Sequence, residues 1–294
     1  MPPSIPTFFP AHHAQVFTTP GGVAYLKEPG VVLIAQTATD IIGLRPFLEQ
    51  FDPALKFGEY VDDPTPLPAG THLCKTAGQT CYCSWGAKRT MNTEAAKYIA
   101  NIVESGHGSV LEHAVYSFFI YGISRSLTHE LVRHRAGCAY SQVSQRYVDD
   151  TTLRFVMRPE YNGDPELEQR FFTNIERAAR EYREITDLLM QRQAAGSEIL
   201  SGEKKRDERK KRQQAARSVL PNETEAPITF TANARALRHT MEMRASDHAE
   251  TEIRRLFMKI YRVALQVDPI LFGDYEVVKL PDGTECLKTE HPKV

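Results

Sequence analysis

The alternation of apolar and polar positions along the chain predicts several β-strands. Residues 31–35 form a short apolar run, which predicts a buried strand. Residues 115–123 are aromatic and β-branched and predict a second strand, and residues 228–231 predict a third. Near the C-terminus, apolar segments on either side of residues 281–283 (PDG) predict a β-hairpin.

Other segments have the capping residues and the periodicity of helices. Ser124 or Ser126 can start a helix that we expect to run to about Arg135. Residues 165–189 place apolar side chains at helical spacing and predict a long amphipathic helix. Asn233 can cap a further helix. Because helices and strands alternate without a regular βαβ rhythm, we expect an α+β fold with helices packed around a mostly antiparallel sheet.

Length and composition indicate an ordinary soluble protein. A chain of 294 residues without an internal repeat or a clean linker can bury one large core. We expect residues 1–30 to be an N-terminal arm and residues 31–294 to be a single domain. No apolar run is long enough to span a bilayer, so no membrane partner is expected. Five cysteines without a secretory signal indicate a reduced compartment, and we expect a cytoplasmic location.

The charge balance argues against nucleic-acid binding. Lys and Arg number 36 against 37 Asp and Glu, so no global positive field attracts nucleic acid. The charge run at residues 203–212 (EKKRDERKKR) intersperses acids among bases, which is typical of a solvated helix face. We therefore expect no nucleic-acid partner. A non-catalytic, arginine-rich RNA-binding protein remains the alternative from a different functional class.

Two familiar motifs are incomplete in this chain. His129 and His134 are five residues apart, about 140° around a helix, so they cannot easily share a metal, and we expect no metal site. Gly106 and Gly108 begin a dinucleotide fingerprint, but Leu111 stands where a third glycine is needed. The phosphates of any bound nucleotide would therefore need arginine and histidine side chains rather than a Rossmann turn.

Such side chains are concentrated in one stretch. Arg133, His134, Arg135 and Arg146 lie within fourteen residues, among hydroxyl and amide side chains. Arginine suits a phosphate because its planar guanidinium can donate two parallel hydrogen bonds. On a helix that reaches Arg135, Glu130, Arg133 and His134 share a face and Arg135 points away, so two different ligands could be contacted. The alternative is an arginine-rich helix end that forms salt bridges with its own acids.

Seven blocks of residues follow one another in a characteristic order between about residues 75 and 255. In this order they resemble the flavin-dependent thymidylate synthase family, and the ordered set is far more specific than any single block. The blocks are Cys81-Tyr82-x-Ser84-Trp85, Gly106-His107-x-Ser109-x-x-Glu112-His113, Gly122 to Arg135 (GISRSLTHELVRHR), Ser141-Gln142-x-Ser144-Gln145-Arg146-Tyr147, Ala216-Arg217-x-x-Leu220-Pro221-Asn222, Asn233-Ala234-Arg235, and Met243-Arg244-Ala245-Ser246-x-His248-Ala249-x-x-Glu252-Ile253-Arg254.

One spacing departs from the family pattern. In the family, Arg-His-Arg is followed by seven residues and then a serine. Here this count reaches Val143, whereas the flanking residues identify Ser144 as the matching serine. We therefore expect a one-residue insertion between Arg135 and Ser141. A hydroxyl at Ser144 is expected to bind a phosphate rather than to act as a nucleophile.

The resemblance implies an enzyme that reductively methylates dUMP to dTMP. Methylenetetrahydrofolate would supply the carbon, FAD would mediate the transfer, and NADPH would reduce the flavin. The resemblance also implies a homotetramer whose active sites are shared between subunits. A related enzyme that methylates UMP or another pyrimidine nucleotide would need most of the same residues, and it remains an alternative.

By the same resemblance, site residues can be assigned to each ligand. Arg244 would place its guanidinium beside N3 and O4 of the uracil and stabilise the anion that forms there, which is the catalytic role. The residues expected at FAD are Ser109, Arg133, His134, Arg135, Gln142, Asn233, Ala234, Arg235 and His239. Those expected at dUMP are Glu130, Leu131, Val132, Arg133, Gln142, Val143, Ser144, Gln145, Arg146, Arg217 and Arg244.

Overall fold

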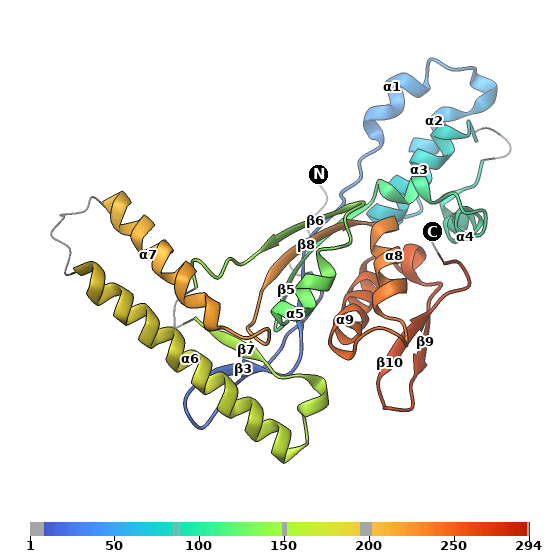
Figure 1. Cartoon of the computed structure of the whole chain (residues 1–294). Helices are drawn as coiled ribbons and strands as arrows, with labels where there is room; N and C mark the ends of the chain where they lie inside the picture. Colours follow the sequence, from blue (N-terminus) through green and yellow to red (C-terminus); the bar gives the residue numbers. More distant parts are fainter. Residues whose placement is uncertain (1–8, 85, 87–88, 149–151, 195–201, 293) are drawn as a thin grey trace.

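A five-stranded antiparallel sheet forms the centre of the molecule (Figure 1). The computed structural model describes residues 9–84, 86, 89–148, 152–194, 202–292 and 294; Trp85 of the first sequence block lies outside them. The strand order is β1-β4-β5-β8-β6, and each neighbouring pair is antiparallel. The strands are β1 Ala11–His12, β4 Gly30–Gln36, β5 Val115–Tyr121, β8 Ile228–Asn233 and β6 Cys138–Gln142.

One face of this sheet packs against helices α8 (Ala234–Arg244) and α9 (Thr251–Val267). Strict alternation in β8 buries Ile228, Phe230 and Ala232 in this core, because successive side chains point to opposite faces of a strand. On the other face, the side chains of Ile34, Val115 and Phe119 are exposed. The predicted α+β fold with a mostly antiparallel sheet is confirmed.

Shorter helices gather at one end of the sheet. Asp268 is buried there and accepts hydrogen bonds from the backbone N–H and the hydroxyl of Thr71, at 2.8 and 2.5 Å. The shorter helices at this end are α1 Arg45–Leu48, α2 Phe57–Val61, α3 Ala69–Cys81, α4 Ala95–Glu104 and α10 Pro269–Phe272. Single 3-10 turns lie at Ile42–Leu44, Pro53–Leu55, Asn92–Glu94, Gly108–Glu112, Pro159–Tyr161 and Arg217–Val219.

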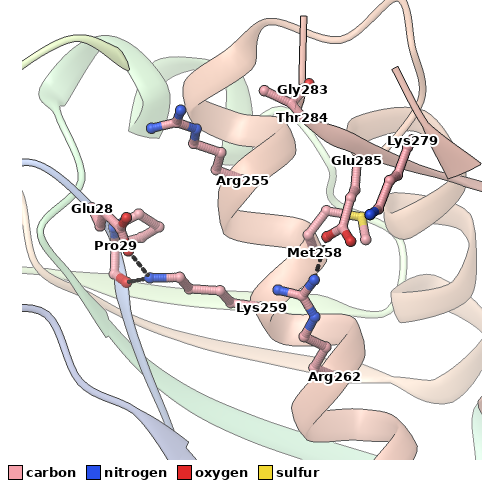
Figure 2. Close-up of a pocket in the computed structure, with 10 residues that line it drawn as sticks. All are labelled: Glu28, Pro29, Arg255, Met258, Lys259, Arg262, Lys279, Gly283, Thr284 and Glu285. Atoms are coloured by element: carbon pink, nitrogen blue, oxygen red, sulfur yellow. Dashed lines mark hydrogen bonds and ion pairs between the residues drawn. The ribbon is translucent and has the colours of Figure 1, made fainter. Parts of the chain in front are cut away.

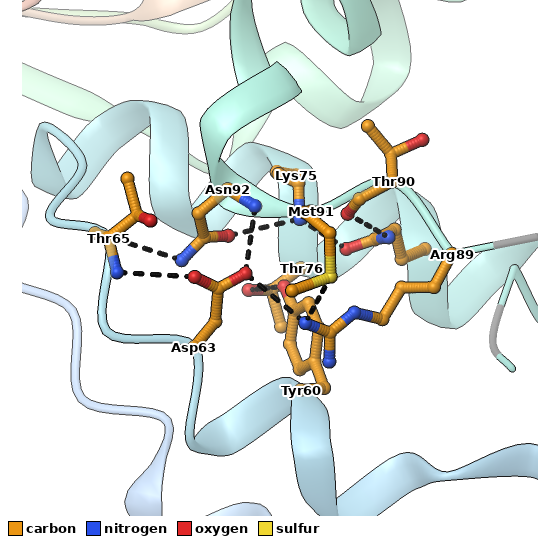
Figure 3. Close-up of polar contacts among 10 residues, drawn as sticks. Tyr60, Asp63, Thr65, Lys75, Thr76, Arg89, Thr90, Met91 and Asn92 are labelled. Carbon is orange, nitrogen blue, oxygen red and sulfur yellow. Dashed lines mark hydrogen bonds and ion pairs between the residues drawn. The ribbon is translucent and has the colours of Figure 1, made fainter. Parts of the chain in front are cut away.

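A buried polar cluster joins α2, α3 and the segment before α4 (Figure 3). Lys75 is fully buried and donates to Gln79 and Asn92, at 2.9 and 3.1 Å. Asp63 pairs with Arg89 at 3.2 Å, and both side chains are at most 5% exposed. Because buried charges are tolerated only when they are paired, this cluster fixes the chain on both sides of the Cys81–Trp85 block.

The helices α6 (Pro165–Ala194) and α7 (Gly202–Ala216) form an antiparallel pair at the other end (Figure 1). The predicted amphipathic helix is confirmed, since its apolar face forms a second core that includes Phe171, Ile175 and Tyr182. A three-stranded sheet completes this part, with β2 Val16–Thr18, β3 Ala24–Leu26 and β7 Arg154–Val156 in the order β2-β3-β7. Residues 11–26 thus contribute strands to both sheets. The division into an N-terminal arm at residues 1–30 and a single domain at residues 31–294 stays a prediction.

The predicted C-terminal hairpin is confirmed as β9 (Glu276–Lys279) and β10 (Glu285–Lys288). The helix after Ser124 is shorter than predicted. Ser124 does cap it, accepting from the N–H of Leu127, but α5 spans only Arg125–Leu131. Arg133, His134 and Arg135 therefore lie in the turn after the helix, and the prediction that they are arranged around a helical face is wrong.

Candidate active site

Arg244 is the centre of a cluster between α5 and α8. Its Nε donates to Nε2 of His134 at 2.9 Å, and its NH1 donates to Oε2 of Glu130 at 2.8 Å. Glu130 is in the last turn of α5, His134 in the turn that follows, and Arg244 at the C-terminal end of α8. The cluster thus joins one residue that was predicted to contact FAD, one predicted to contact dUMP, and the predicted catalytic arginine.

His134 is held as a neutral imidazole. Burial, then the positive charge of Arg244 and then the neighbouring His239, lower its pKa to about 4. The His239 ring lies edge-on to it, at 6.3 Å between centroids. Tyr140 holds the turn after α5 in place, because its hydroxyl donates to the carbonyl of His134 at 2.8 Å. A neutral ring can accept the Arg244 hydrogen bond at Nε2, which a protonated ring cannot.

Asn233 holds the start of α8 close to this turn. Its side chain caps the helix by accepting from the N–H of Ala236 at 2.8 Å, as predicted. Its own N–H donates to the carbonyl of Gly137 at 3.0 Å. Gly137 has φ +70°, and a Cβ there would come within 2.6 Å of the Asn233 amide nitrogen. The close approach and the positive φ both require glycine, which explains why the chain can turn from α5 into β6 at this point.

Arg235 extends from the first turn of α8 towards the 3-10 turn at Gly108–Glu112. Its NH1 donates to Oε1 of Glu112 at 2.6 Å, and a Cβ on Gly108 would lie only 3.0 Å from its Nε. Ser109, in the same turn, is exposed. The Ser109 block and the Asn233-Ala234-Arg235 block therefore meet in space although they are more than a hundred residues apart.

Two further arginines lie open beside this cluster. Arg133 and Arg135 are exposed, and neither forms an ion pair with a described residue. Their guanidinium groups can therefore bind an anion, whereas Arg235 already pairs with Glu112. This donor set fits the diphosphate of a flavin dinucleotide, because arginine forks bind phosphate in pairs of hydrogen bonds.

The predicted substrate loop follows the C-terminal end of β6. Gln142 is the last residue of this strand, and the N–H of Val143 donates to the carbonyl of Pro227 at 2.8 Å. The hydroxyl of Ser144 accepts from Nε of Arg146 at 3.3 Å. Gln145 is buried, and its side-chain nitrogen has no partner among the described residues. This amide lines a cavity of about 270 Å³, where an oxygen-rich ligand could accept its hydrogen bonds.

The predicted dUMP residues are therefore in two groups within one chain. Glu130 and Arg244 lie near the start of β6, whereas Ser144 and Arg146 follow its end. Arg217 lies in the 3-10 turn after α7, in the part of the molecule built around α6. The five residues of β6 span about 17 Å, and no hydrogen bond or ion pair among the described residues connects the two groups.

Two apolar residues of the predicted set, Leu131 and Ala234, can contact a ligand only through the backbone. Leu131 and Ala234 are fully buried in the main core, and Val132 packs against it. Two contacts were not predicted. Glu112 was recognised only as part of a block and pairs with Arg235, and Tyr140 orients His134 from β6. The alternation of half-buried and exposed residues along β6 was the only signal for Tyr140, and its small polar neighbours made that signal weak.

In the described part of the chain, no group of three or more His, Cys, Asp or Glu residues is placed to hold a metal ion. Likewise, no described helix is long and apolar enough to cross a membrane.

Comparisons with known proteins identify the fold. Two structures of PolB from Streptomyces cacaoi, a UMP/dUMP methylase, share it at 18% sequence identity. The complex with 5-Br dUMP has a TM-score of 0.54 and covers 84% of this chain and 94% of PolB. The complex with 5-Br UMP has a TM-score of 0.55 and covers 84% and 93%. At this identity the likeness concerns the fold alone.

Sequence comparisons identify the family. Residues 65–270 match the family model described as thymidylate synthase complementing protein. The flavin-dependent thymidylate synthase of Mycobacterium sp. (strain JLS) is 45% identical over 225 residues, which are 76% of this chain and 87% of the relative. That of Mycobacterium leprae (strain Br4923) is 43% identical over 221 residues, covering 75% and 86%. The chain is thus an enzyme that belongs to the flavin-dependent thymidylate synthase family.

Proposed function

We propose that this enzyme reductively methylates dUMP to dTMP. Methylenetetrahydrofolate supplies the carbon, FAD mediates the transfer and NADPH is the reductant. The overall reaction consumes dUMP, methylenetetrahydrofolate, NADPH and a proton, and it yields dTMP, tetrahydrofolate and NADP⁺. The single observation that carries the proposal is the Arg244 cluster, since it joins the predicted flavin residue His134 to the predicted substrate residue Glu130.

The chemistry calls for a cation at the edge of the uracil. Carbon 5 of uracil is a weak nucleophile, and removing the proton from N3 pushes electron density towards it. A guanidinium beside N3 and O4 stabilises the resulting anion, provided that it is already oriented before the reaction. His134 and Glu130 bind Nε and NH1 of Arg244, and NH2 forms no hydrogen bond to a described residue. We assign NH2 to the uracil.

The flavin site combines the residues around Asn233. Arg133, Arg135 and Arg235 hold the phosphates, Ser109 and His239 line the approach, and Gly137 admits the backbone close to the cap of α8. The bound flavin supplies the hydride and carries the one-carbon unit. The contribution of the chain is to bind, orient and exclude water. No cysteine needs to attack the base.

The substrate phosphate belongs to Ser144, Arg146 and Arg217, at the far end of β6 from Arg244. Because a nucleotide cannot contact both groups across the length of one strand, a complete site needs residues of a second copy. We therefore propose a homotetramer with active sites shared between subunits. The exposed side chains of Ile34, Val115 and Phe119 on the open face of the central sheet support contact with another copy.

Visible absorption tests the cofactor. The purified protein, or the protein after incubation with FAD and removal of the excess, should be yellow with a flavin spectrum. A protein that stays colourless and takes up no FAD would contradict the proposal. In parallel, an Arg133→Gln, Arg135→Gln variant should retain the fold but lose most flavin.

The second candidate substrate is UMP. PolB, whose fold this chain shares, is a UMP/dUMP methylase, and the two nucleotides differ only at the ribose 2′ position. Turnover of equal amounts of dUMP and UMP, with the methylated products resolved by mass, decides between them. The proposal expects dTMP as the main product, and a preference for UMP would overturn the assignment of substrate.

A non-catalytic RNA-binding protein would behave differently. It would bind RNA with an affinity that falls steeply with salt, and the binding would depend on the charge run in α7. The flavin-dependent enzyme needs neither property. Salt-dependent RNA binding together with absence of flavin would favour this alternative.

A further inference from the structure

Helix α9 is enclosed by the fold except along one stripe. From Glu252 to Ala264, every residue is buried apart from Arg255, Lys259 and Arg262. These three residues stand at positions i, i+4 and i+7 and therefore share one face of the helix. Between Glu252 and Ala264, the open stripe of this helix is thus entirely cationic.

This stripe forms the floor of a cavity of about 460 Å³ (Figure 2). Glu28 and Pro29, just before β4, form one wall. The hairpin forms the other wall, through Lys279 of β9 and residues 283–285 at its turn. Figure 2 shows the three cations along one side of α9, with Glu28 and Pro29 across from Lys259.

The acids of the cavity neutralise only half of its cations. Lys259 donates to Glu28 at 2.8 Å and to the carbonyl of Pro29 at 2.9 Å. Arg262 pairs with Glu285. Arg255 and Lys279 form no ion pair with a described residue, so two positive charges are in excess.

Among the described residues that line the cavity, Glu28 and Glu285 are the only acids. Asp282, at the hairpin turn, accepts from Arg254 at 3.1 Å and from the N–H of Thr284 at 2.9 Å, and it does not line the cavity. His12 on β1 responds to two of the cations of the cavity. Burial lowers the pKa of His12, and Lys259 and Arg262 lower it further. Like charges on one helix face destabilise it, so an anion that binds there is favoured.

We propose that this cavity binds a phosphorylated small molecule that carries at least two negative charges. Arginine and lysine together match a phosphate, since the guanidinium fork binds two oxygens and the ammonium adds a point charge. The volume suits a small molecule such as a nucleotide or a sugar phosphate rather than a protein segment. The ligand complements the two excess charges on Arg255 and Lys279.

The site is separate from the candidate active site. Glu28 and Pro29 precede β4, next to the β1 edge of the sheet, whereas Arg133 to Arg135 precede β6 at the opposite edge. The proposal does not depend on the reaction assigned above, because binding can be measured without flavin or turnover.

Calorimetric titration of the full chain with pyrophosphate and, separately, with dTTP tests this site. At low ionic strength we expect wild-type protein to bind at least one of them, and the Arg255→Gln, Lys279→Gln double variant to bind about tenfold or more weakly. Neither side chain forms an ion pair with a described residue, although Lys279 lies across the hairpin from Glu285, so the variant should fold. Pyrophosphate binding would show that phosphate alone suffices, whereas binding of dTTP alone would identify a nucleotide as the ligand.

A matched variant removes two charges elsewhere. The Arg170→Gln, Lys56→Gln double variant changes two side chains on the exposed surface. It should bind pyrophosphate or dTTP as tightly as the wild type. The NMR resonance of His12 gives a local readout, since a bound anion should raise its pKa in the wild type but not in the Arg255→Gln, Lys279→Gln variant. Absence of binding to wild-type protein, or equal binding by both double variants, would overturn the proposal.

Discussion

Arg244 and His134 come from segments 110 residues apart and meet through a hydrogen bond from Nε to Nε2 at 2.9 Å. The direction of this bond requires an unprotonated His134, which agrees with the low pKa of its ring. Glu130 holds NH1 of the same guanidinium. The orientation of Arg244 thus depends on two residues of the α5 region, and its remaining nitrogen, NH2, forms no hydrogen bond to a described residue.

Replacement of Arg244 should abolish most activity without unfolding the protein. Arg244→Ala removes the proposed cation beside N3 and O4, and we expect kcat to fall by about 100-fold or more. Arg244→Lys should recover little, because an ammonium cannot bind His134 and Glu130 with a planar fork. Steady-state kinetics and circular dichroism provide the test, with Arg170→Ala on exposed α6 as the control. Near-normal kcat in Arg244→Ala would refute the role.

The His134 ring should titrate with a pKa of about 4, well below its ordinary value of 6.5. Between these two pH values the unfolded chain binds a proton that the folded chain does not. The free energy of unfolding should therefore fall as the pH is lowered from 6.5 to 4. NMR titration, with His134→Gln to assign the resonance, measures this directly. A His134 that titrates near 6.5 would mean that the ring is not desolvated by the cluster.

Gly137→Ala should damage the site as well as the backbone. The substitution places a Cβ at φ +70° and within 2.6 Å of the Asn233 amide nitrogen, and we expect a loss of about 2 kcal/mol or more together with weaker flavin retention. Gly163 also has a positive φ, of +92°, but open space around it. Gly163→Ala should show only the backbone strain, about 1 kcal/mol. Urea unfolding and flavin absorbance compare the two variants, and equal effects would argue against the close packing at Asn233.

Two neighbouring aspartates should differ sharply in their contribution to stability. Asp63 pairs with Arg89 inside the polar cluster, so Asp63→Asn leaves a buried guanidinium uncompensated and should cost about 3 kcal/mol. Asp62 pairs with Arg45 on the surface, and Asp62→Asn should change little, because solvent screens exposed pairs. Urea unfolding gives both free energies. Similar small losses would indicate that the cluster around Lys75 is open to water.

The elements with a clear apolar period were predictable from the sequence. The run at 31–35, the aromatic strand before Gly122, the long α6 and the C-terminal hairpin all bury one regular apolar face. Helix α3 was not predicted, because its buried face carries Thr71, Lys75 and Gln79 instead of apolar residues. These polar side chains are satisfied only by distant segments, which a local pattern cannot reveal.

The resemblance named the candidate site residues, which stay a prediction, but the sequence did not show how they are arranged. No helix-breaking residue separates Leu131 from Gly137, so the early end of α5 was not visible in the sequence. Strand β6 was missed because it is an edge strand of small and polar residues. Its position separates Arg244 from Ser144, and the proposed homotetramer rests on this separation.

The most direct test of the central claim is the release of tritium from dUMP labelled at carbon 5. With FAD, NADPH and methylenetetrahydrofolate present, the wild-type enzyme should release tritium to water and form dTMP in equal amounts. Repeated turnover should require FAD, NADPH and methylenetetrahydrofolate together. The release of tritium should be lost in the Arg244→Ala variant. A flavin-loaded protein that neither releases tritium nor forms dTMP would contradict the proposed function.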